Sequence, residues 1–242
     1  MKTAKFGILI IAVGLLASCK KGGVFCYRED GNIITQERSV GSFTEVALSD
    51  IGHVYVEQAD QQSVIVETSS NLQDIIVTEV KGNTLEIKTK KGKCIKGNPT
   101  LNVYVKTPNL NALTISGSGS IYASRLVTTS NMELCISGSG DITLDSLSTD
   151  DLKATISGSG NIVVEGADTM SYENLNISGS GNITTINYPA LKAKATISGS
   201  GSCKVHAINE LNVSISGSGD VLYRGTPAIT NSSSGSGTVK PY

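Results

Sequence analysis

Short apolar runs alternate with a repeated Gly/Ser phrase along most of the chain. Leu113, Thr114 and Ile115 lead into the first copy and Ile121 follows it, so apolar and polar residues alternate on both sides of the phrase. Alternation with a period of two residues is typical of β-strands that bury one face. The phrase ISGSG opens at Ile115, Ile136, Ile156, Ile177, Ile197 and Ile215, and a weaker copy opens at Ser233.

The copies recur at intervals of 21, 20, 21, 20, 18 and 18 residues. Periods near twenty residues indicate stacked structural units, whereas a flexible linker would show no fixed interval and would have polar flanks. The pattern therefore predicts an all-β fold, a right-handed parallel β-helix (β-solenoid) with coils of about 20 residues. With strands of successive coils paired in register about 4.8 Å apart, the repeats would form a stack about 29 Å long.

Each Gly/Ser phrase is expected to form a tight corner between two strands, because a β-carbon there would collide with its neighbours. Six residues separate Ile115 from Ile121, so both side chains point to the same side of the coil. On that parity the corner glycines face inward, and Ser116, Ser118 and Ser120 face outward, where their hydroxyls could hydrogen-bond along the stack. The corner glycines are Gly117, Gly119, Gly138, Gly140, Gly158, Gly160, Gly179, Gly181, Gly199, Gly201, Gly217 and Gly219.

Both ends of the repeated region fit the same fold. In the last copy Ser233 replaces the isoleucine within a polar stretch, as expected of a unit that caps the core. Upstream, Val46–Gln58 resembles a degenerate coil with the letters SDIG at its corner. No helix pattern appears after the first eighteen residues. Further strand-like runs lie at residues 63–68, 74–80, 84–90 and 101–107.

The first eighteen residues have the features of a bacterial export signal. Lys2 and Lys5 precede an apolar run that is too short to span a bilayer, and the letters LASC follow. This end resembles the lipobox of bacterial lipoproteins, which implies cleavage before Cys19 and lipidation of that cysteine. The alternative is an ordinary secretory signal that contains a cysteine. We divide the chain into a signal peptide (1–18), a lipidated tether (19–37) and a single β-helical domain (38–242), with irregular coils over 38–110 and SGSG repeats over 111–242.

Charge is nearly balanced, with 20 Lys and Arg residues against 21 Asp and Glu residues. Removal of residues 1–18 would take away two lysines and change the formal net charge from −1 to −3. Such a chain has no basic surface for nucleic acid, and its charge argues against electrostatic binding to an anionic membrane.

Four cysteines remain besides Cys19. Cys26 and Cys94 lie outside the repeats in loop-like stretches and are the candidates for a disulfide in an oxidising envelope compartment. Cys135 and Cys203 lie inside the repeats and are expected to pack as small residues. The chain has no CxxC motif, so neither thiol redox chemistry nor a zinc site is supported.

Few residues indicate catalysis or a cofactor. His53 and His206 lie in distant coils without clustered ligands, so exposed strand positions are expected for both. Asp141 and Asp220 follow corner glycines, but other copies carry Ser, Asn or Thr there, which favours a turn position over a calcium site. The motifs of a dinucleotide loop and of an esterase elbow are both incomplete. We therefore predict no catalytic residue, no metal and no cofactor.

Three surface features are candidates for binding. Acidic residues in neighbouring returns could line the face of a polysaccharide-cleaving enzyme, although such charges are more often a solvated surface. Tyr55 and Tyr122 occupy corresponding places after a corner, where they offer either an amphipathic contact surface or, as we favour, ordinary β-propensity. A lysine cluster could touch anionic glycan or lipid, but we favour its role in protecting a hairpin edge. The acidic residues are Asp145, Asp150, Asp151 and Glu165, and the lysines are Lys81, Lys88, Lys90, Lys91, Lys93 and Lys96.

The order of several short motifs resembles one bacterial envelope family. SFTEV, VYVEQ, LEIKT and VYVKTPNL precede the Gly/Ser coils in this order, and the likeness runs from Arg38 to the C-terminus. The family is described as the putative auto-transporter adhesin, head GIN domain, a domain of unknown function. The resemblance implies a right-handed β-helical fold on exported, often lipid-anchored proteins, and it transfers no catalytic motif.

These observations together predict a non-enzymatic, lipid-anchored cell-envelope protein, an outer-membrane lipoprotein whose rigid β-solenoid serves adhesin-like binding or scaffolding. The alternative is a carbohydrate-active β-helix enzyme that acts on polysaccharide. The expected partners are the membrane, through the lipid on Cys19, and a glycan or an envelope protein. Self-association into a homo-oligomer is a further alternative, and nucleic acid is not expected.

Overall fold

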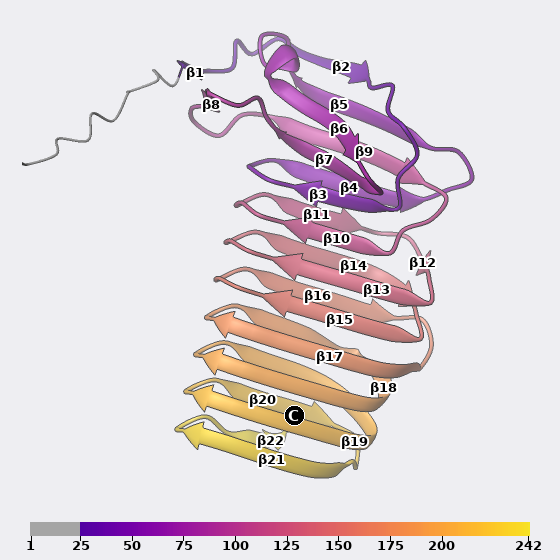
Figure 1. The fold of residues 1–242 in the computed structure, drawn as a ribbon, viewed down its shortest axis with the longest axis vertical. Helices are drawn as coiled ribbons and strands as arrows, with labels where there is room; N and C mark the ends of the chain where they lie inside the picture. The colour runs from indigo at the N-terminus through magenta and orange to yellow at the C-terminus, as the bar shows by residue number, and fades with distance from the viewer. Residues whose placement is uncertain (1–24) are drawn as a thin grey trace, which may run out of the picture.

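The fold is a β-solenoid in which flat coils stack on one another along a single axis (Figure 1). The computed structural model describes residues 25–242. These residues contain no α-helix, and one 3-10 turn, η1, spans Gln73–Ile75. The parallel pairing of strands about twenty residues apart confirms the predicted all-β solenoid.

Each regular coil contains two strands joined by a Gly/Ser corner, so the stack has two facing sheets. In stack order, the first sheet contains β7 (Thr84–Thr89), β3 (Glu45–Leu48), β10 (Ala112–Ile115), β13 (Asn131–Ile136), β15 (Asp151–Ile156) and β17 (Met170–Gly179). The second contains β9 (Leu101–Thr107), β4 (His53–Gln58), β11 (Ser120–Ala123), β14 (Asp141–Ser148) and β16 (Asn161–Gly166), with the short β12 (Val127–Thr128) beside β14. The long strands β18 (Asn182–Gly199) and β19 (Ser202–Gly217) run through both sheets, and β20 (Asp220–Arg224), β21 (Ala228–Gly235) and β22 (Val239–Pro241) complete the stack.

The core lies between the two sheets and is built from rows of aliphatic side chains. Ile136 lies beside Ile156, and Ile156 lies beside Ile177, in parallel strands that keep the same register. These three side chains are at most 2% exposed. Burial of each contributes about 1.5–3 kcal/mol. One coil cannot bury its own apolar face, so the fold depends on stacking.

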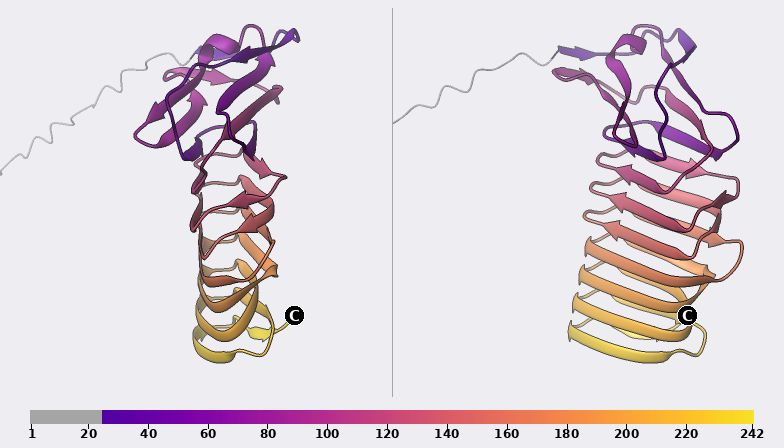
Figure 2. Two further views of the ribbon diagram at one scale, coloured as in Figure 1. Left: turned by 90° about the vertical axis from the view of Figure 1, so that its right-hand side faces the viewer. Right: turned by 45° about the vertical axis from the view of Figure 1, so that its right-hand side comes forward.

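The N-terminal end departs from a simple succession of coils (Figure 2). β7 and β9 pair with β3 and β4 on the side opposite β10 and β11, so a coil later in the sequence lies above an earlier one. Three antiparallel strands then extend the sheets at this end. They are β5 (Ser63–Ser69) on β9, β2 (Ile33–Glu37) on β5, and β6 (Ile76–Lys81) on β7.

The degenerate coil predicted at Val46–Gln58 is confirmed. Its strands pair in register with the first SGSG coil, placing Leu48 beside Ile115 and Val54 beside Ile121. Successive coils do not stack in chain order at this point. More than fifty residues separate Gln58 from Ala112. This segment forms the coil of β7 and β9 above β3 and β4, and the chain then continues below them with β10 and β11.

The other end of the stack is covered by a polar coil, as predicted. In β21, Asn231 lies beside Val213 and Ser233 lies beside Ile215, so polar residues occupy two places of the inward row, while Ile229 beside Leu211 remains apolar. The hydroxyl of Ser233 donates to the side-chain oxygen of Asn231. The last coil therefore meets solvent with polar groups where the coils above it carry aliphatic ones.

Candidate functional site

The corner glycines allow the coils to approach one another closely. A β-carbon on Gly138 would lie under 3.0 Å from the carbonyl oxygen of Gly117, and one on Gly140 would meet both Gly119 and Ile115. Real β-carbons essentially never approach other atoms this closely. The same collision occurs one coil further on at each of Gly158, Gly160, Gly179, Gly181, Gly199, Gly201, Gly217 and Gly219, while Gly117 and Gly119 meet the backbone of Asp50 and Gly52.

The predicted orientation of the corner residues needs correction. The first glycine of a copy faces along the stack, toward the coil above, and Gly117 is half-buried rather than part of the core. Ser116 and Ser118 are exposed as expected, but Ser120 is only 8% exposed. The simple parity argument fails because the corner bends the chain, and strict alternation holds only in extended backbone.

Three tyrosines form a continuous row on the outer face of the second sheet, where Tyr55 and Tyr104 are exposed and Tyr122 is half-buried. Tyr104 on β9, Tyr55 on β4 and Tyr122 on β11 lie in register on neighbouring strands. The ring centroids of Tyr55 and Tyr104 are 5.3 Å apart and those of Tyr55 and Tyr122 are 5.7 Å apart, with interplanar angles of 17° and 23°. Tyr55 is 40% exposed and Tyr104 is 39% exposed. We call these three residues the tyrosine platform.

Polar side chains lie along one side of the tyrosine platform. The carboxylate of Glu67 accepts hydrogen bonds from the hydroxyl of Tyr104 and from the side-chain amide of Asn102, both at 2.9 Å. The bond to Glu67 raises the pKa of the Tyr104 hydroxyl, which keeps it a donor. His53 completes this side, with its ring centroid 6.0 Å from that of Tyr122.

The other side carries a small charged cluster. Glu57 pairs with Arg125 at 3.1 Å and with Lys106 at 3.4 Å. A shallow cavity of about 130 Å³ lies between this cluster and the rings, and the side chain of Arg125 is 73% exposed beside it. The tyrosine platform therefore combines ring surface with donors and acceptors on both sides.

The sequence located only part of this site. Tyr55 and Tyr122 were predicted to occupy corresponding places in their coils. Their presence was attributed to β-propensity, so their stacking was not predicted. Tyr104 was missed because its strand follows Tyr55 by almost fifty residues yet stacks directly above it. The repeated letters VYV in both strands were the available signal.

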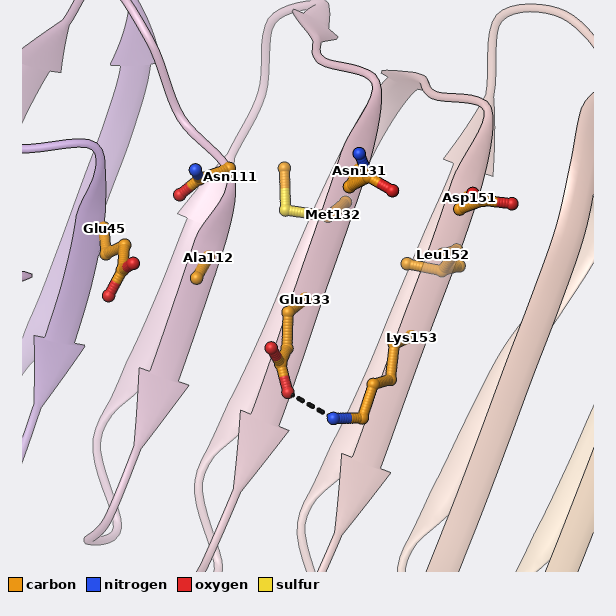
Figure 3. Close-up of a pocket in the computed structure, with 9 residues that line it drawn as sticks. All are labelled: Glu45, Asn111, Ala112, Asn131, Met132, Glu133, Asp151, Leu152 and Lys153. Carbon is orange, nitrogen blue, oxygen red and sulfur yellow. Dashed lines mark hydrogen bonds and ion pairs between the residues drawn. The ribbon is translucent and has the colours of Figure 1, made fainter.

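A second depression lies on the first sheet (Figure 3), with a volume of about 350 Å³. Glu45, Ala112 and Glu133 follow one another along one row, and the small Ala112 leaves the space between the two carboxylates. Glu133 accepts a hydrogen bond from Lys153 at 2.7 Å. The lining residues come from the first sheet, and the charged ones stand on its outer face.

The four acidic residues considered as the lining of an enzyme's face do not gather there, in line with the solvated surface favoured from the sequence. Among Asp145, Asp150, Asp151 and Glu165, only Asp151 lines this depression. Glu165 instead accepts from Asn187 at 3.2 Å. The turn residues Asp141 and Asp220 accept hydrogen bonds from the following coil, and within residues 25–242 no three His, Cys, Asp or Glu side chains lie close enough to hold a metal ion.

Other candidate residues make structural contacts. Lys81 and Lys88 pair with Glu79 and Glu86 across the β6–β7 hairpin, consistent with the edge role favoured from the sequence. Burial, with a smaller effect from nearby Arg224, lowers the pKa of His206. Lys93 on β8 (Lys93–Ile95) lies over the rings of Phe25 and Tyr27 on β1 (Phe25–Tyr27).

The cysteines divide into two groups. Cys26 and Cys94 are joined by a disulfide that connects β1 to β8, with their Cα atoms 4.4 Å apart. Cys203 packs in the core, whereas Cys135 is half-buried in an outward row beside Thr114 and Thr155. The predicted lipidation site, Cys19, lies outside the described residues.

One buried acid was not anticipated from the sequence. Glu173 on β17 is fully buried in the core row, where it lies between Leu152 and Ala193 of the adjacent coils. Its only hydrogen-bond partner is the hydroxyl of Thr185, at 2.8 Å, and its second carboxyl oxygen has none. Burial raises the pKa of Glu173 to about 8. A comparison of the residues that stand four places before the corner isoleucine of each coil would have revealed Glu173.

Comparison with known proteins agrees with this architecture. A family profile described as "Putative auto-transporter adhesin, head GIN domain" matches residues 42–227. The chain belongs to this family. Its adhesin-like character indicates a cell-envelope protein, and no curated protein sequence matches the chain significantly.

Solved structures show the same fold. A putative adhesin from Bacteroides fragilis is 26% identical, with a TM-score of 0.84, and the match covers 89% of this chain and 100% of that one. A protein from Parabacteroides distasonis, named a putative lipid binding protein, is 29% identical, with a TM-score of 0.76 and coverage of 90% and 99%. A putative adhesin from the same species is 24% identical, with a TM-score of 0.69 and coverage of 90% and 100%, and shows the likeness of fold alone.

Proposed function

We propose that this chain is a non-enzymatic, lipid-anchored outer-membrane protein that uses its rigid solenoid for adhesin-like binding. The observation that carries the proposal is the tyrosine platform on the outer face of a solenoid whose interior is filled by side chains. Exposed aromatic rows are typical of contact surfaces because they combine large apolar area with a polar tip. Membership of an adhesin-like family supports the same assignment.

The packing of the solenoid suits a binding role. Val54, Val103 and Ile121 lie on the inward side of the strands that carry the platform, and each is at most 1% exposed. The packed core thus holds in place the strands that carry the side chains of the outer face. A surface that is already ordered loses little conformational entropy when it binds.

The anchor is supported by the sequence before Cys19, where a basic start and an apolar run lead to the letters LASC. Within residues 25–242, no helix is long and apolar enough to cross a membrane. Several acyl chains on one cysteine would hold the protein firmly at the membrane surface.

The experiment compares intact cells that carry the chain with cells that lack it. We expect an external protease to remove the protein from intact cells, and loss of the gene to reduce attachment to glycan-coated or cellular surfaces. Cys19→Ala should release the protein from the membrane fraction without unfolding it. Unchanged attachment in the deletion strain would refute the proposal.

A polysaccharide-cleaving enzyme is the second candidate, because Glu45 and Glu133 lie in one row on either side of Ala112 (Figure 3). Glycosidases place two carboxyl groups on opposite sides of a bond in a cleft. Here both acids rise from the same sheet, Glu133 is paired with Lys153, and Glu45 accepts from Thr84 at 2.6 Å. Release of reducing ends from a polysaccharide by the wild type but not by Glu133→Gln would favour the enzyme.

One relative, from Parabacteroides distasonis, is named a putative lipid binding protein. An acyl chain needs an enclosed apolar cavity, and the space between the two sheets here is filled by side chains such as Leu113, Leu134 and Ile142, which are 0% exposed. We therefore place the binding function on the outer surface.

A further inference from the structure

We infer that the tyrosine platform binds a linear, uncharged glycan that lies along the axis of the stack, with one sugar ring over each tyrosine. The inference rests on the proposed binding function and names its ligand class and site. It follows from the spacing of the rings, their tilt, the polar groups beside them and the balance of charge.

The three rings are stacked in a row. Adjacent rings are nearly parallel, but their centroids are 5.3 and 5.7 Å apart, which is more than the roughly 3.5–4.0 Å contact distance between carbon atoms. Parallel rings that stay in contact at these centroid distances are displaced sideways from one another, which is a preferred arrangement of aromatic pairs. Part of the face of each ring remains open, in agreement with the 40% and 39% exposure of Tyr55 and Tyr104.

This spacing fits a sugar chain. The distance from one ring to the next is close to the length of one pyranose unit in an extended β-linked chain. Three successive sugars can then each place an apolar C–H face on a tyrosine ring. The row ends at Ile65 above and at Thr143 below, so the aromatic surface accommodates about three units.

The groups beside the rings match the rest of a sugar. Hydroxyls at the edge of a pyranose both donate and accept hydrogen bonds. Glu67 and Asn102 lie on one side of the row, and Glu57, Lys106 and Arg125 lie on the other, so both kinds of partner are present. These groups already form hydrogen bonds and ion pairs with one another, which lowers the entropy cost of ordering them on binding.

The charges select an uncharged ligand. The two carboxylates beside the rings, Glu57 and Glu67, are equal in number to the two cations, Lys106 and Arg125, so the surface as a whole has no excess of either sign. A nucleic acid or an anionic polysaccharide requires a surplus of basic groups. A neutral hexose or N-acetylhexosamine chain has no such requirement.

The test is titration calorimetry with the full chain in detergent and a panel of linear, β-linked hexose and N-acetylhexosamine oligomers of one to six units. We expect affinity to rise up to about three units and then level off. Tyr55→Thr should weaken binding about fivefold, which corresponds to about 1 kcal/mol for one stacked aromatic contact. Threonine is the residue that the chain itself places in this row at Thr143, so the strand is preserved.

The matched control is Tyr172→Thr. Tyr172 is also exposed, at 36%, but lies on the first sheet outside the tyrosine platform. Both variants should show wild-type circular dichroism, and only Tyr55→Thr should lose binding. If Tyr55→Thr does not fold, Tyr104→Thr replaces it.

Three outcomes overturn the inference. They are no binding to any neutral oligomer, affinity that stops rising at one unit, and binding that is equal in the Tyr55→Thr and Tyr172→Thr variants. If cells still attach in a protein-dependent way that periodate treatment of the target does not reduce, the proposed adhesion stands and the ligand is a protein. If wild-type cells do not attach, the proposed function itself fails.

Discussion

Replacement of Glu173 by glutamine should make the protein more stable at high pH and should change little at low pH. Burial raises the pKa of Glu173 from its ordinary value of 4.5 to about 8 in the folded state. Between these two values the folded chain keeps a proton that the unfolded chain has lost. Stability therefore falls as pH rises from about 4.5 to about 8, and it levels off above pH 8.

The size of the effect follows from the shift. Each pH unit is equivalent to about 1.4 kcal/mol, so the full interval lowers the free energy of unfolding by about 5 kcal/mol, and by about 3 kcal/mol at pH 7. Glutamine removes this loss because it carries no charge. It can also keep the contact with Thr185, since that hydroxyl lies 2.8 Å from Glu173 and 3.3 Å from the carbonyl of Lys204 and can accept from an amide while it donates to that carbonyl.

The assay is thermal unfolding by circular dichroism from pH 4 to pH 9. We expect equal midpoints near pH 4 and a midpoint roughly 10–20 °C higher for Glu173→Gln at pH 9. Glu37→Gln, at an exposed glutamate on β2, is the control and should follow the wild type. Parallel pH profiles for Glu173→Gln and the wild type would refute the reasoning.

Three further substitutions or treatments test the packing. Gly158→Ala should lower the free energy of unfolding by about 1–3 kcal/mol or more in urea titration, because the added methyl meets the carbonyl of the coil above, whereas Gly41→Ala, which meets no atom within 4 Å, should have little effect. Tyr188→Phe should cost about 1–3 kcal/mol in the same titration, because the buried amide that donates to its hydroxyl at 2.8 Å loses its partner, and an unchanged midpoint would contradict that contact. Reduction of the Cys26–Cys94 disulfide should accelerate hydrogen exchange in β1 and β8 and leave the coils unchanged, whereas an absence of disulfide in the intact mass would contradict the pairing.

The repeated part of the fold could be predicted because its information is local. The interval between copies gives the coil, and the alternation around Ile136 or Ile156 gives the strands and their buried side. In parallel strands that pair in register, each inward residue has the same neighbours in every coil. The prediction of one coil therefore applies to the next.

The arrangement of the N-terminal coils and the tyrosine platform could not be predicted from local sequence patterns. The letters VYV mark the strands of Tyr55 and Tyr104 as alike, but they do not state that one strand lies above the other, because this pairing depends on how a long link is placed in space. The antiparallel pairing of β5 with β9 depends on the same long-range choice. Glu173 is a different case, since its place in an aliphatic row is visible in the sequence once the coils are aligned.

Because each coil of the repeated region contacts mainly the coils directly before and after it, the number of coils is not fixed by the rest of the fold. Insertion or loss of one whole unit of about twenty residues during evolution would change the height of the molecule by about 4.8 Å and leave every remaining interface intact. Members of the family can therefore differ in length along the stack axis by whole coils, while the tyrosine platform near the N-terminal end stays the same.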